Sequence, residues 1–271
     1  MPDTKKGGIT STAAKLIAIA LMLIDHTAVV FEAQLTTSDA GAAVYEIMRT
    51  SARIAFPLFA FFIAVGAVYT SNILKYMLRL LLFAFISEVP FDLAFNGAVF
   101  ETGYQNVFFT LFLGLLSIFL YKKLRELHLE PVAFLLLFGI AYAAEELLKT
   151  DYGAMGVICI FLFYVFLQTK APYKQIGLVL TCLLVSLMLA FNPYTVPLTY
   201  RITPDLTFSL PRLHMDVSLT FNYAEFFAVA AAPFILLFNG SKGRKINRWF
   251  FYVFYPAHLA LLAGIHWLIF H

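Results

Sequence analysis

Hydrophobic residues recur along this chain in runs of roughly 15 to 23, separated by short polar connections. A helix rising about 1.5 Å per residue crosses a hydrocarbon core of about 30 Å in about 20 residues. The pattern therefore predicts an all-α polytopic membrane protein, in which a single domain, residues 1–271, contains about nine transmembrane helices. A count of eight stays open, because the runs beginning at Asn106 and Gly153 are short. The nine predicted spans are Ser11–Phe31, Arg53–Thr70, Lys75–Phe95, Asn106–Tyr121, Pro131–Leu148, Gly153–Leu167, Ile176–Leu198, Leu219–Phe238 and Trp249–Phe270.

Composition changes this picture little, since 61% of the 271 residues are hydrophobic and only 13% are charged. Such a balance excludes a soluble globular domain. The first run carries Asp25 and His26 in its middle and has no small-residue cleavage pattern, so we expect it to stay as a span. Cys159 and Cys182 fall within spans, where we expect them to pack as small apolar groups.

Basic residues predict the orientation, because Lys and Arg are enriched in the cytoplasmic connections of membrane proteins. Fourteen of the 19 Lys and Arg residues fall where alternate connections would share one side. We therefore expect a cytoplasmic N-terminus and an extracytoplasmic C-terminus in the bacterial cytoplasmic membrane. The fourteen are Lys5, Lys6, Lys15, Lys75, Arg79, Lys122, Lys123, Arg125, Lys170, Lys174, Lys242, Arg244, Lys245 and Arg248.

The connection between Leu198 and Leu219 is the one outer loop with room for recognition. Within it, from Leu213 to Phe221, apolar and polar residues alternate. A period of two indicates an extended strand at the membrane interface. An amphipathic surface loop fits the same pattern, so both interpretations stay open.

Two histidines are predicted to lie at the same depth in the membrane. His26 is eleven residues, or about 16 Å, along the first span from Lys15. His258 is ten residues, or about 15 Å, along the last span from Arg248. Tyr255 lies nearly one turn below His258. Both histidines are therefore expected near the middle of the bilayer.

Charged residues also occur inside the predicted spans. Glu88 and Asp92 are four residues apart and share one face of the third span, in its outer half. Each unpaired charge at the middle of a bilayer costs about 2.5 to 3.5 kcal/mol on insertion scales, so these residues must face protein or water. Either they form interhelical pairs that fix the packing, such as Asp25 or Glu88 with Arg53, or they belong to a functional site.

A set of short motifs follows in a fixed order along almost the whole chain. It opens with KLIAIALMLIDH from Lys15 to His26 and with RIAFPLFAF from Arg53. The later motifs are KYMLR at 75–79, ISEVPFD at 86–92, NVFFT at 106–110 with Gly114, Glu145, KTDYG at 149–153 with Gly156, and YPAH at 255–258. Each motif alone is weak, but the ordered set resembles the TraX family.

The resemblance implies a polytopic acetyltransferase. Founding TraX members acetylate the amino terminus of conjugative pilin, and the family is similar to larger transmembrane acyltransferases, which move acyl groups from cytoplasmic coenzyme A thioesters to acceptors on the far side. In the first span those enzymes carry an arginine, ten residues and a histidine, whereas this chain has Lys15, ten residues and His26. A lysine can pair with a phosphate but cannot make the bidentate contact of an arginine.

Acyl transfer assigns roles to these residues. His26 is the candidate general base, because histidine accepts a proton near neutral pH. Asp25, as its neighbour in sequence, cannot share its helix face and is expected to pair with another helix. Donors to the developing oxyanion, a role worth about 3 to 4 kcal/mol in other acyl-transfer sites, can be Arg53, Asn106, Tyr255 or His258. The candidate catalytic residues are thus His26, Asp25, Arg53, Glu88, Tyr255 and His258.

The expected acyl donor is acetyl-CoA, whose phosphates suit the basic residues at the cytoplasmic end, although the positive-inside bias alone would also place them there. Candidate cofactor-binding residues are Lys15, Lys75, Arg79 and Asn106. Candidate acceptor-binding residues are Asp92, Glu145, Asp151 and Tyr152. The histidines lack the close spacing of a metal site, and the basic residues are too dispersed to bind nucleic acid.

Besides membrane lipid, the expected partners are the acyl donor and an acceptor that is a pilin, another peptide or a glycan; a lipid amine fits equally well. Two functions of other classes remain possible. Buried acids and histidines can form the path of a proton- or ion-coupled transporter or flippase, with prolines such as Pro57 and Pro256 breaking its helices. A scaffold for assembling a surface appendage is the third.

Overall fold

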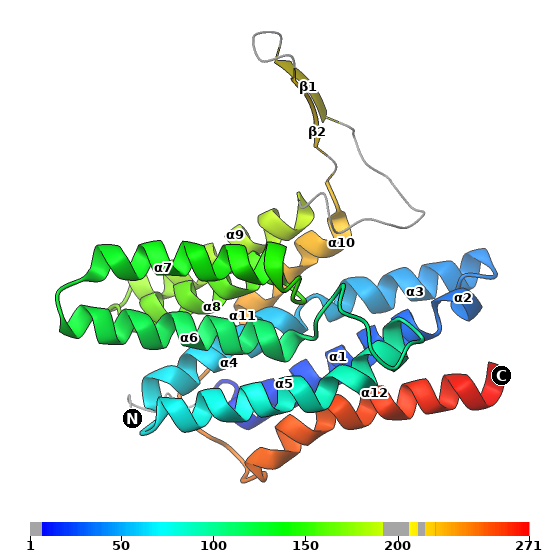
Figure 1. Cartoon of the computed structure of the whole chain (residues 1–271), viewed down its shortest axis with the longest axis horizontal. Coiled ribbons are helices and arrows are strands. Elements are labelled where there is room, and N and C mark those ends of the chain that lie inside the picture. The colour runs from blue at the N-terminus through cyan, green and yellow to red at the C-terminus, as the bar shows by residue number, and fades with distance from the viewer. Residues whose placement is uncertain (1–6, 192–205, 211–214, 220, 271) are drawn as a thin grey trace.

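Most of the described chain is helical in its computed structural model, which describes residues 7–191, 206–210, 215–219 and 221–270. Within these ranges the strands form one two-stranded hairpin (Figure 1). The α-helices are α1 (Ser11–Val30), α2 (Glu32–Leu35), α3 (Asp39–Ala52), α4 (Ala55–Tyr69), α5 (Ile73–Phe95), α6 (Val107–Glu126), α7 (Glu130–Tyr142), α8 (Gly153–Leu167), α9 (Tyr173–Ala190), α10 (Tyr223–Phe226), α11 (Ala231–Leu236) and α12 (Arg248–Phe270). A π-helix, η1 (Ala143–Leu147), extends α7, and a 3₁₀ helix, η2 (Phe227–Ala230), joins α10 to α11. The strands are β1 (Leu206–Leu210) and β2 (Met215–Leu219).

Five helical stretches are long and apolar enough to cross a membrane, judged by length and composition. They are Ser11–Val30, Asp39–Tyr69, Val107–Glu126, Tyr173–Ala190 and Arg248–Phe270. Two shorter apolar helices, Gly153–Leu167 and Tyr223–Leu236, accompany them. Helix α5 is 23 residues long, but it is not among the five stretches, because it carries two basic and two acidic residues. These helices are those of a polytopic membrane protein, as the hydrophobic pattern predicts.

The helices pack in two groups that meet at α4 and along α5 and α6 (Figure 1). In one group, α12 lies along α5 and α1, so the last helix joins the first. In the other group, α8 packs against α6, α7 and α9. A Cβ built on Gly114 of α6 would lie 2.5 Å from Cδ1 of Ile160 on α8, so the glycine lets these two helices approach closely.

Polar side chains cap the N-terminal ends of several helices. Oγ1 of Thr10 accepts a hydrogen bond from the backbone N–H of Ala13 at the start of α1. Asn72 accepts from the N–H of Lys75 at the start of α5, at 2.8 Å. Asn106 does the same for Phe108 and α6, at 3.0 Å. Such caps satisfy N–H groups that have no partner inside the helix, and they fix where each span begins.

Residues 32–52 differ from the sequence interpretation, which left them as an outer connection. They form α2 and α3, and only Arg53 and Ile54 separate α3 from α4. Ser38 caps α3 by accepting from the N–H of Gly41 at 3.2 Å. The hydrophobic pattern missed this helix because polar residues are frequent in it, while membrane spans are recognised by their lack of polar residues.

The predicted span Leu219–Phe238 is shorter in the structure, where the apolar helical segment runs from Tyr223 to Leu236. Strand β2 occupies residues up to Leu219, and the helical part that follows is divided into α10, η2 and α11. Pro233 lies in the first turn of α11, where its missing N–H leaves no bond unmade. In the middle of a continuous α-helix, a proline would instead remove one backbone hydrogen bond. Pro233 therefore favours the start of a new helix, α11, near this position.

The alternating pattern after Leu213 is confirmed as a strand over Met215–Leu219. This strand pairs antiparallel with β1, from Leu206 opposite Leu219 to Leu210 opposite Met215. The remainder of the pattern on residues 213, 214 and 220 lies outside the described residues, as do residues 192–198 of the seventh predicted span. Helix α9 of that span ends at Ala190.

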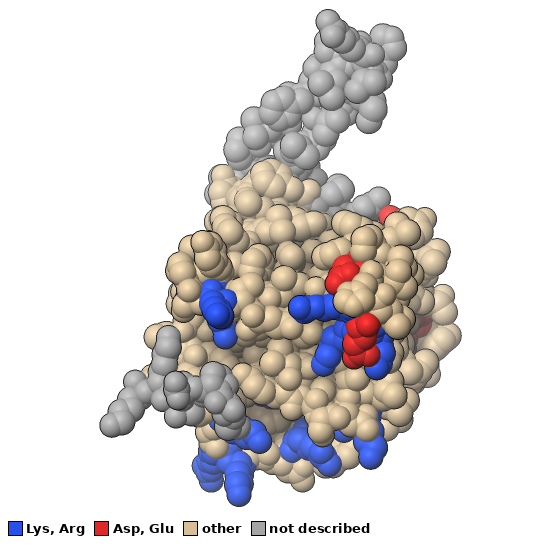
Figure 2. Space-filling model, turned by 90° about the vertical axis from the view of Figure 1, so that its left-hand side faces the viewer, with Lys and Arg blue, Asp and Glu red and all other residues tan. Residues whose placement is uncertain are grey.

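Basic residues gather at one end of the helices. The start of the described chain and the connections from α4 to α5 and from α6 to α7 lie at the same end in Figure 1, whereas α12 ends at the opposite one. Figure 2 looks onto the first of these ends and shows several groups of Lys and Arg with few Asp and Glu among them. We call this face the basic end.

Candidate active site

His26 of α1 and His258 of α12 are in direct contact. Nδ1 of His26 lies 2.6 Å from Nε2 of His258, and the two rings are nearly parallel, at 10°. Phe95 and Tyr255 present their edges to the His26 ring, with centroids 5.2 and 5.8 Å away. The equal depths that the sequence predicts for these histidines are thus confirmed, and the helix packing also turns them toward each other.

The second nitrogen of His258 is also in a hydrogen bond. Its Nδ1 lies 2.8 Å from the carbonyl oxygen of Phe254, one turn earlier on α12. His258 is buried, whereas His26 is only half-buried. No nitrogen of His258 is therefore left to bind an acyl oxygen, as one of the sequence-based roles would require.

A network of ion pairs lies beside His26. Asp25 accepts from Nη1 of Arg49 at 2.6 Å and from Nη2 of Arg53 at 3.0 Å. Nη1 of Arg53 also lies 3.4 Å from Glu225 on α10. Two positive and two negative side chains thus join α1, α3, the junction between α3 and α4, and α10. The expected pair of Asp25 with a second helix is confirmed, and Asp25 holds helices together instead of binding the His26 ring.

Arg49 is the residue of this network that the sequence interpretation missed. Arg49 and Arg53 are four residues apart, and Nε of Arg53 donates to the carbonyl oxygen of Arg49 at 3.2 Å. Two basic residues at this spacing on one helix share a face. The four-residue spacing of Arg49 and Arg53 predicts a shared face only when residues 39–52 are known to be helical.

Glu88 of α5 pairs with Asn106 of α6, and not with Arg53. Oε2 of Glu88 accepts from Nδ2 of Asn106, which also donates to the carbonyl oxygen of Ala84 at 2.8 Å. The other oxygen, Oε1, is buried without a hydrogen-bond partner among the described residues. Both hydrogen bonds that the Asn106 side chain donates therefore go to residues of α5. Asn106 does not lie with the basic residues proposed to bind the cofactor.

Tyr255 of α12 is nearly fully buried. Its ring meets the ring of Phe108 edge-on, with centroids 5.2 Å apart, and it contacts His26 on another side. The backbone N–H of Val107 lies close to its hydroxyl oxygen, and the hydroxyl hydrogen has no acceptor within the described part of the chain. A buried hydrogen-bond donor without an acceptor costs free energy, so this hydroxyl is a candidate for a functional role.

Asp92 and Glu145 serve the backbone. Asp92 accepts from the N–H of Glu101 at 2.8 Å and from Nδ2 of Asn96 at 3.2 Å. Glu145, within the π-helix, accepts from the N–H of Ala154 at 2.9 Å and so caps α8. Asp92 thus holds the connection that follows α5 and Glu145 caps α8, which accounts for both carboxylates without a bound acceptor.

Asp151 and its neighbours form the polar connection between η1 and α8. The hydroxyl of Tyr104 donates to Oδ1 of Asp151 at 2.7 Å, and Tyr152 stacks on Phe56 with ring centroids 3.7 Å apart. Burial raises the pKa of Asp151 to about 6, although the bond from Tyr104 and the charge of Arg53 act against it. Asp151 therefore changes charge near neutral pH.

The three basic candidates lie apart from this polar cluster. Nζ of Lys15 is 5.2 Å from the ring centre of Phe62 and 5.6 Å from that of Phe251. Lys75 is exposed, and Arg79 lies over Tyr76 with its Nε buried and unpartnered among the described residues. Glu88 is nine residues, about 13 Å, farther along α5 than Arg79.

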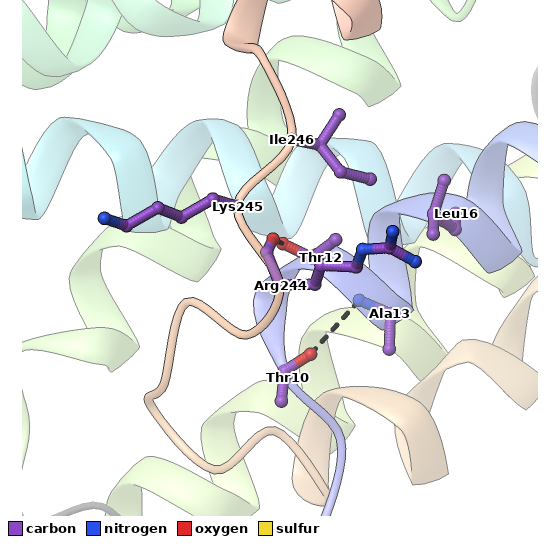
Figure 3. A pocket seen from close by; sticks show the side chains of 7 residues that line it. All are labelled: Thr10, Thr12, Ala13, Leu16, Arg244, Lys245 and Ile246. Carbon is purple, nitrogen blue, oxygen red and sulfur yellow. Dashed lines mark hydrogen bonds between the residues drawn. The ribbon is translucent and has the colours of Figure 1, made fainter.

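A hollow of about 500 Å³ opens at the start of α1 (Figure 3). It lies between the first turn of this helix and residues 244–246, and the side chain of Arg244 points across it. Thr12 holds this segment by donating to the carbonyl oxygens of Lys242 and Arg244, at 2.7 and 2.9 Å. Within the described ranges, no three His, Cys, Asp or Glu side chains lie together as a metal site would need.

Comparison with known proteins gives matches over nearly the whole length of the chain, as the ordered set of motifs predicts. Residues 11–266 match the family described as TraX protein. The "Probable fimbrial assembly protein FimC, serogroup H1" of Dichelobacter nodosus is 30% identical over 261 residues, covering 92% of this chain and 93% of that protein. No solved structure matches the chain. The match over nearly all of its length shows that this chain belongs to the TraX family.

Proposed function

We propose that this protein is a membrane-embedded acetyltransferase, which moves an acetyl group from cytoplasmic acetyl-CoA to an amine or hydroxyl in the outer half of the bacterial cytoplasmic membrane. The whole chain is one domain of about nine spans, with its N-terminus in the cytoplasm. The observation that carries the proposal is the placement of His26. A half-buried histidine, held by His258 and in edge-on contact with the ring of Tyr255, lies about 16 Å along α1 from Lys15 near the basic end.

These residues suit a direct transfer step. The acceptor amine first loses one proton to water, and its neutral nitrogen then attacks the thioester carbonyl of acetyl-CoA while His26 takes a second proton from that nitrogen. Tyr255 donates its free hydroxyl hydrogen to the oxyanion that develops. The carbon–sulfur bond then breaks, and the proton on His26 passes to the departing thiolate. An N-acetylated acceptor and free coenzyme A result.

The two substrates would reach His26 from opposite ends. The phosphates of acetyl-CoA suit the basic end, and its pantetheine arm would extend between the helices toward His26. The acceptor would enter beside Asp151 and Tyr152. A relative named as a probable fimbrial assembly protein supports a fimbrial or pilin-like peptide as the acceptor, through its amino terminus.

The test is release of free thiol from acetyl-CoA by the purified protein in detergent, with a peptide amine, an amino sugar or neither added. We expect release that depends on an acceptor. Neither binding nor hydrolysis of acetyl-CoA, with every acceptor supplied, would refute the acetyltransferase.

A proton- or ion-coupled transporter is the second candidate. The observation that favours it is the buried network around Arg53, next to the divided segment formed by α10, η2 and α11. Transporters use such interrupted helices and buried charges at their binding sites. A transporter would move its solute in proteoliposomes without consuming acetyl-CoA, so the thiol assay separates the two functions.

Arg79→Gln is expected to raise the KM for acetyl-CoA about ten- to hundredfold, because one charge-assisted hydrogen bond is worth about 1.5 to 3 kcal/mol. The buried and unpartnered Nε of Arg79 is the reason to choose this residue. The KM for the acceptor should not change. Steady-state kinetics beside Lys170→Gln, an exposed lysine in the connection from α8 to α9, checks the result; equal effects of the two substitutions would mean a general effect of charge.

Acceptor binding is expected to depend on the charge of Asp151. A peptide amino terminus stays protonated below pH 7, while Asp151, whose pKa burial raises to about 6, ionises between pH 5 and 7. The Kd of an acceptor peptide should therefore fall about tenfold as the pH rises over this interval. Asp151→Asn should abolish the change.

Tyr104→Phe gives the sharper form of this test. The bond that Tyr104 donates lowers the pKa of Asp151, so its loss should move the midpoint of the Kd change to higher pH. Asp39→Asn, at an exposed acid of α3, serves as the control and should leave the curve in place. A Kd independent of pH in the unsubstituted protein would exclude Asp151 from acceptor binding.

A further inference from the structure

The hydrogen bonds of His258 determine which nitrogen of His26 can act as a base. A carbonyl oxygen only accepts, so Nδ1 of His258, 2.8 Å from the carbonyl of Phe254, must carry a hydrogen. In a neutral ring the other nitrogen, Nε2, then has none and can only accept. The hydrogen in the 2.6 Å contact therefore belongs to Nδ1 of His26.

The surroundings favour a neutral His258. A charged ring in this position would need a carboxylate partner, because an isolated charge among helices is costly. Among the described residues no acid forms an ion pair with either histidine. The carboxylate next in sequence, Asp25, is bound by Arg49 and Arg53, so it is already neutralised.

The aromatic rings around the pair hold this geometry. Phe254 stacks on His258 with ring centroids 4.9 Å apart, at an angle of 17°. Tyr255 meets the same ring at 5.7 Å and the ring of His26 at 5.8 Å. Because each ring is packed on more than one side, a rotation of His258 that offered Nδ1 to His26 would break both the packing and the bond to Phe254.

From this geometry we infer that His258 is a positioning residue, which fixes His26 with its hydrogen on Nδ1 and so leaves Nε2 of His26 as the basic nitrogen. The inference rests on the proposed acetyl transfer only for its consequence in catalysis. Nε2 of His26 would take the proton from the acceptor nitrogen, and the bond from Nδ1 to His258 would strengthen as His26 becomes positive. His258 keeps its own hydrogen on the bond to Phe254, so no proton passes through it.

The first test needs no catalytic activity. In the full-length protein labelled with ¹⁵N-histidine and placed in liposomes, the ring signals of His26 are those that disappear in His26→Gln. We expect Nδ1 of His26 to be protonated and Nε2 to be bare, with a through-bond coupling to Nε2 of His258. A protonated Nε2 with a bare Nδ1 on His26 would overturn the inference, whether or not the protein transfers acetyl groups.

The second test separates positioning from packing. His258→Phe keeps a ring but removes the acceptor, and we expect kcat to fall about a hundredfold with the KM for acetyl-CoA unchanged, because His26 is no longer oriented. His258→Gln retains an oxygen that can accept from Nδ1 of His26, and it should restore kcat to within about tenfold of the unsubstituted protein.

His266→Phe is the matched control, since His266 lies two turns farther along α12 among Phe31 and Phe270 and away from His26. This control should keep its kcat. Equal losses in His258→Phe and His258→Gln would contradict a positioning role and assign His258 to packing alone. Loss of acetyl transfer in every protein, including the unsubstituted one, would refute the proposed function while the ¹⁵N spectrum still decided the positioning of His26.

Discussion

His26→Asn is expected to lower the rate of acetyl transfer by about 10² to 10⁴, the range that a general base contributes. Asparagine can still donate a hydrogen bond to Nε2 of His258, but it cannot take a proton from the acceptor. The loss should therefore appear in kcat, while acetyl-CoA and the acceptor bind with unchanged Kd. Thiol release under saturating substrates, together with titrations of both ligands, measures the two quantities separately.

The same substitution at His128 is the control for this experiment. His128 lies in the exposed connection between α6 and α7 with a backbone φ of 57°, which asparagine tolerates better than most residues. His128→Asn should transfer acetyl groups at the normal rate. A His26→Asn protein that keeps more than about a tenth of the normal kcat would show that His26 is not the base.

The common level of the two histidines along their helices could be predicted from the sequence, whereas the direction of each side chain could not. Counting residues from Lys15 and Arg248 placed His26 and His258 at one level, because the rise of a helix is nearly constant. That they touch depends on α12 lying beside α1, although the two helices stand at opposite ends of the chain. Contacts between such distant segments follow from the packing of all the helices.

The roles of the acidic residues show a second limit. Asp92 and Glu145 looked like acceptor ligands because carboxylates in apolar runs are unusual. In the structure Asp92 accepts from the N–H of Glu101, in the connection that follows α5, at 2.8 Å, and Glu145 accepts from the N–H of Ala154, in the first turn of α8, at 2.9 Å. A pattern of residue types cannot distinguish a cap from a ligand, since the N–H groups that need a partner are known only when the helix ends are known.

The third limit concerns helices that are not spans. Because α3 contains Asp39 and Arg49, its polarity concealed it from a search for apolar runs. Its last turn nevertheless supplies the second arginine on Asp25. The sequence therefore predicted that the charge of Asp25 inside the first span needs a partner, and it identified Arg53. It did not reveal that Asp25 pairs with two arginines, Arg49 and Arg53.

Arg53→Met is expected to destabilise the fold by about 3 to 5 kcal/mol, the cost of leaving buried charges without a partner. The Arg53 side chain is only 8% exposed and bridges Asp25 to Glu225. After the substitution Asp25 keeps Arg49, whereas Glu225 loses the one ion pair it makes in the described part of the chain. Unfolding in detergent by increasing dodecyl sulfate, followed by circular dichroism, measures the change in free energy.

Two further variants distinguish the effect of a buried charge without a partner from the effect of lost packing. Arg53→Met combined with Glu225→Gln should recover part of the loss, because the carboxylate without a partner is removed as well. Lys123→Met breaks an ion pair between side chains that are 58% and 63% exposed, so it should cost no more than about 1 kcal/mol. If Arg53→Met were as mild as Lys123→Met, the network would not hold α1, the junction between α3 and α4, and α10 together. Asp25 would then be free for a role beside His26, and the division between a structural Asp25 and a catalytic His26 would have to be abandoned.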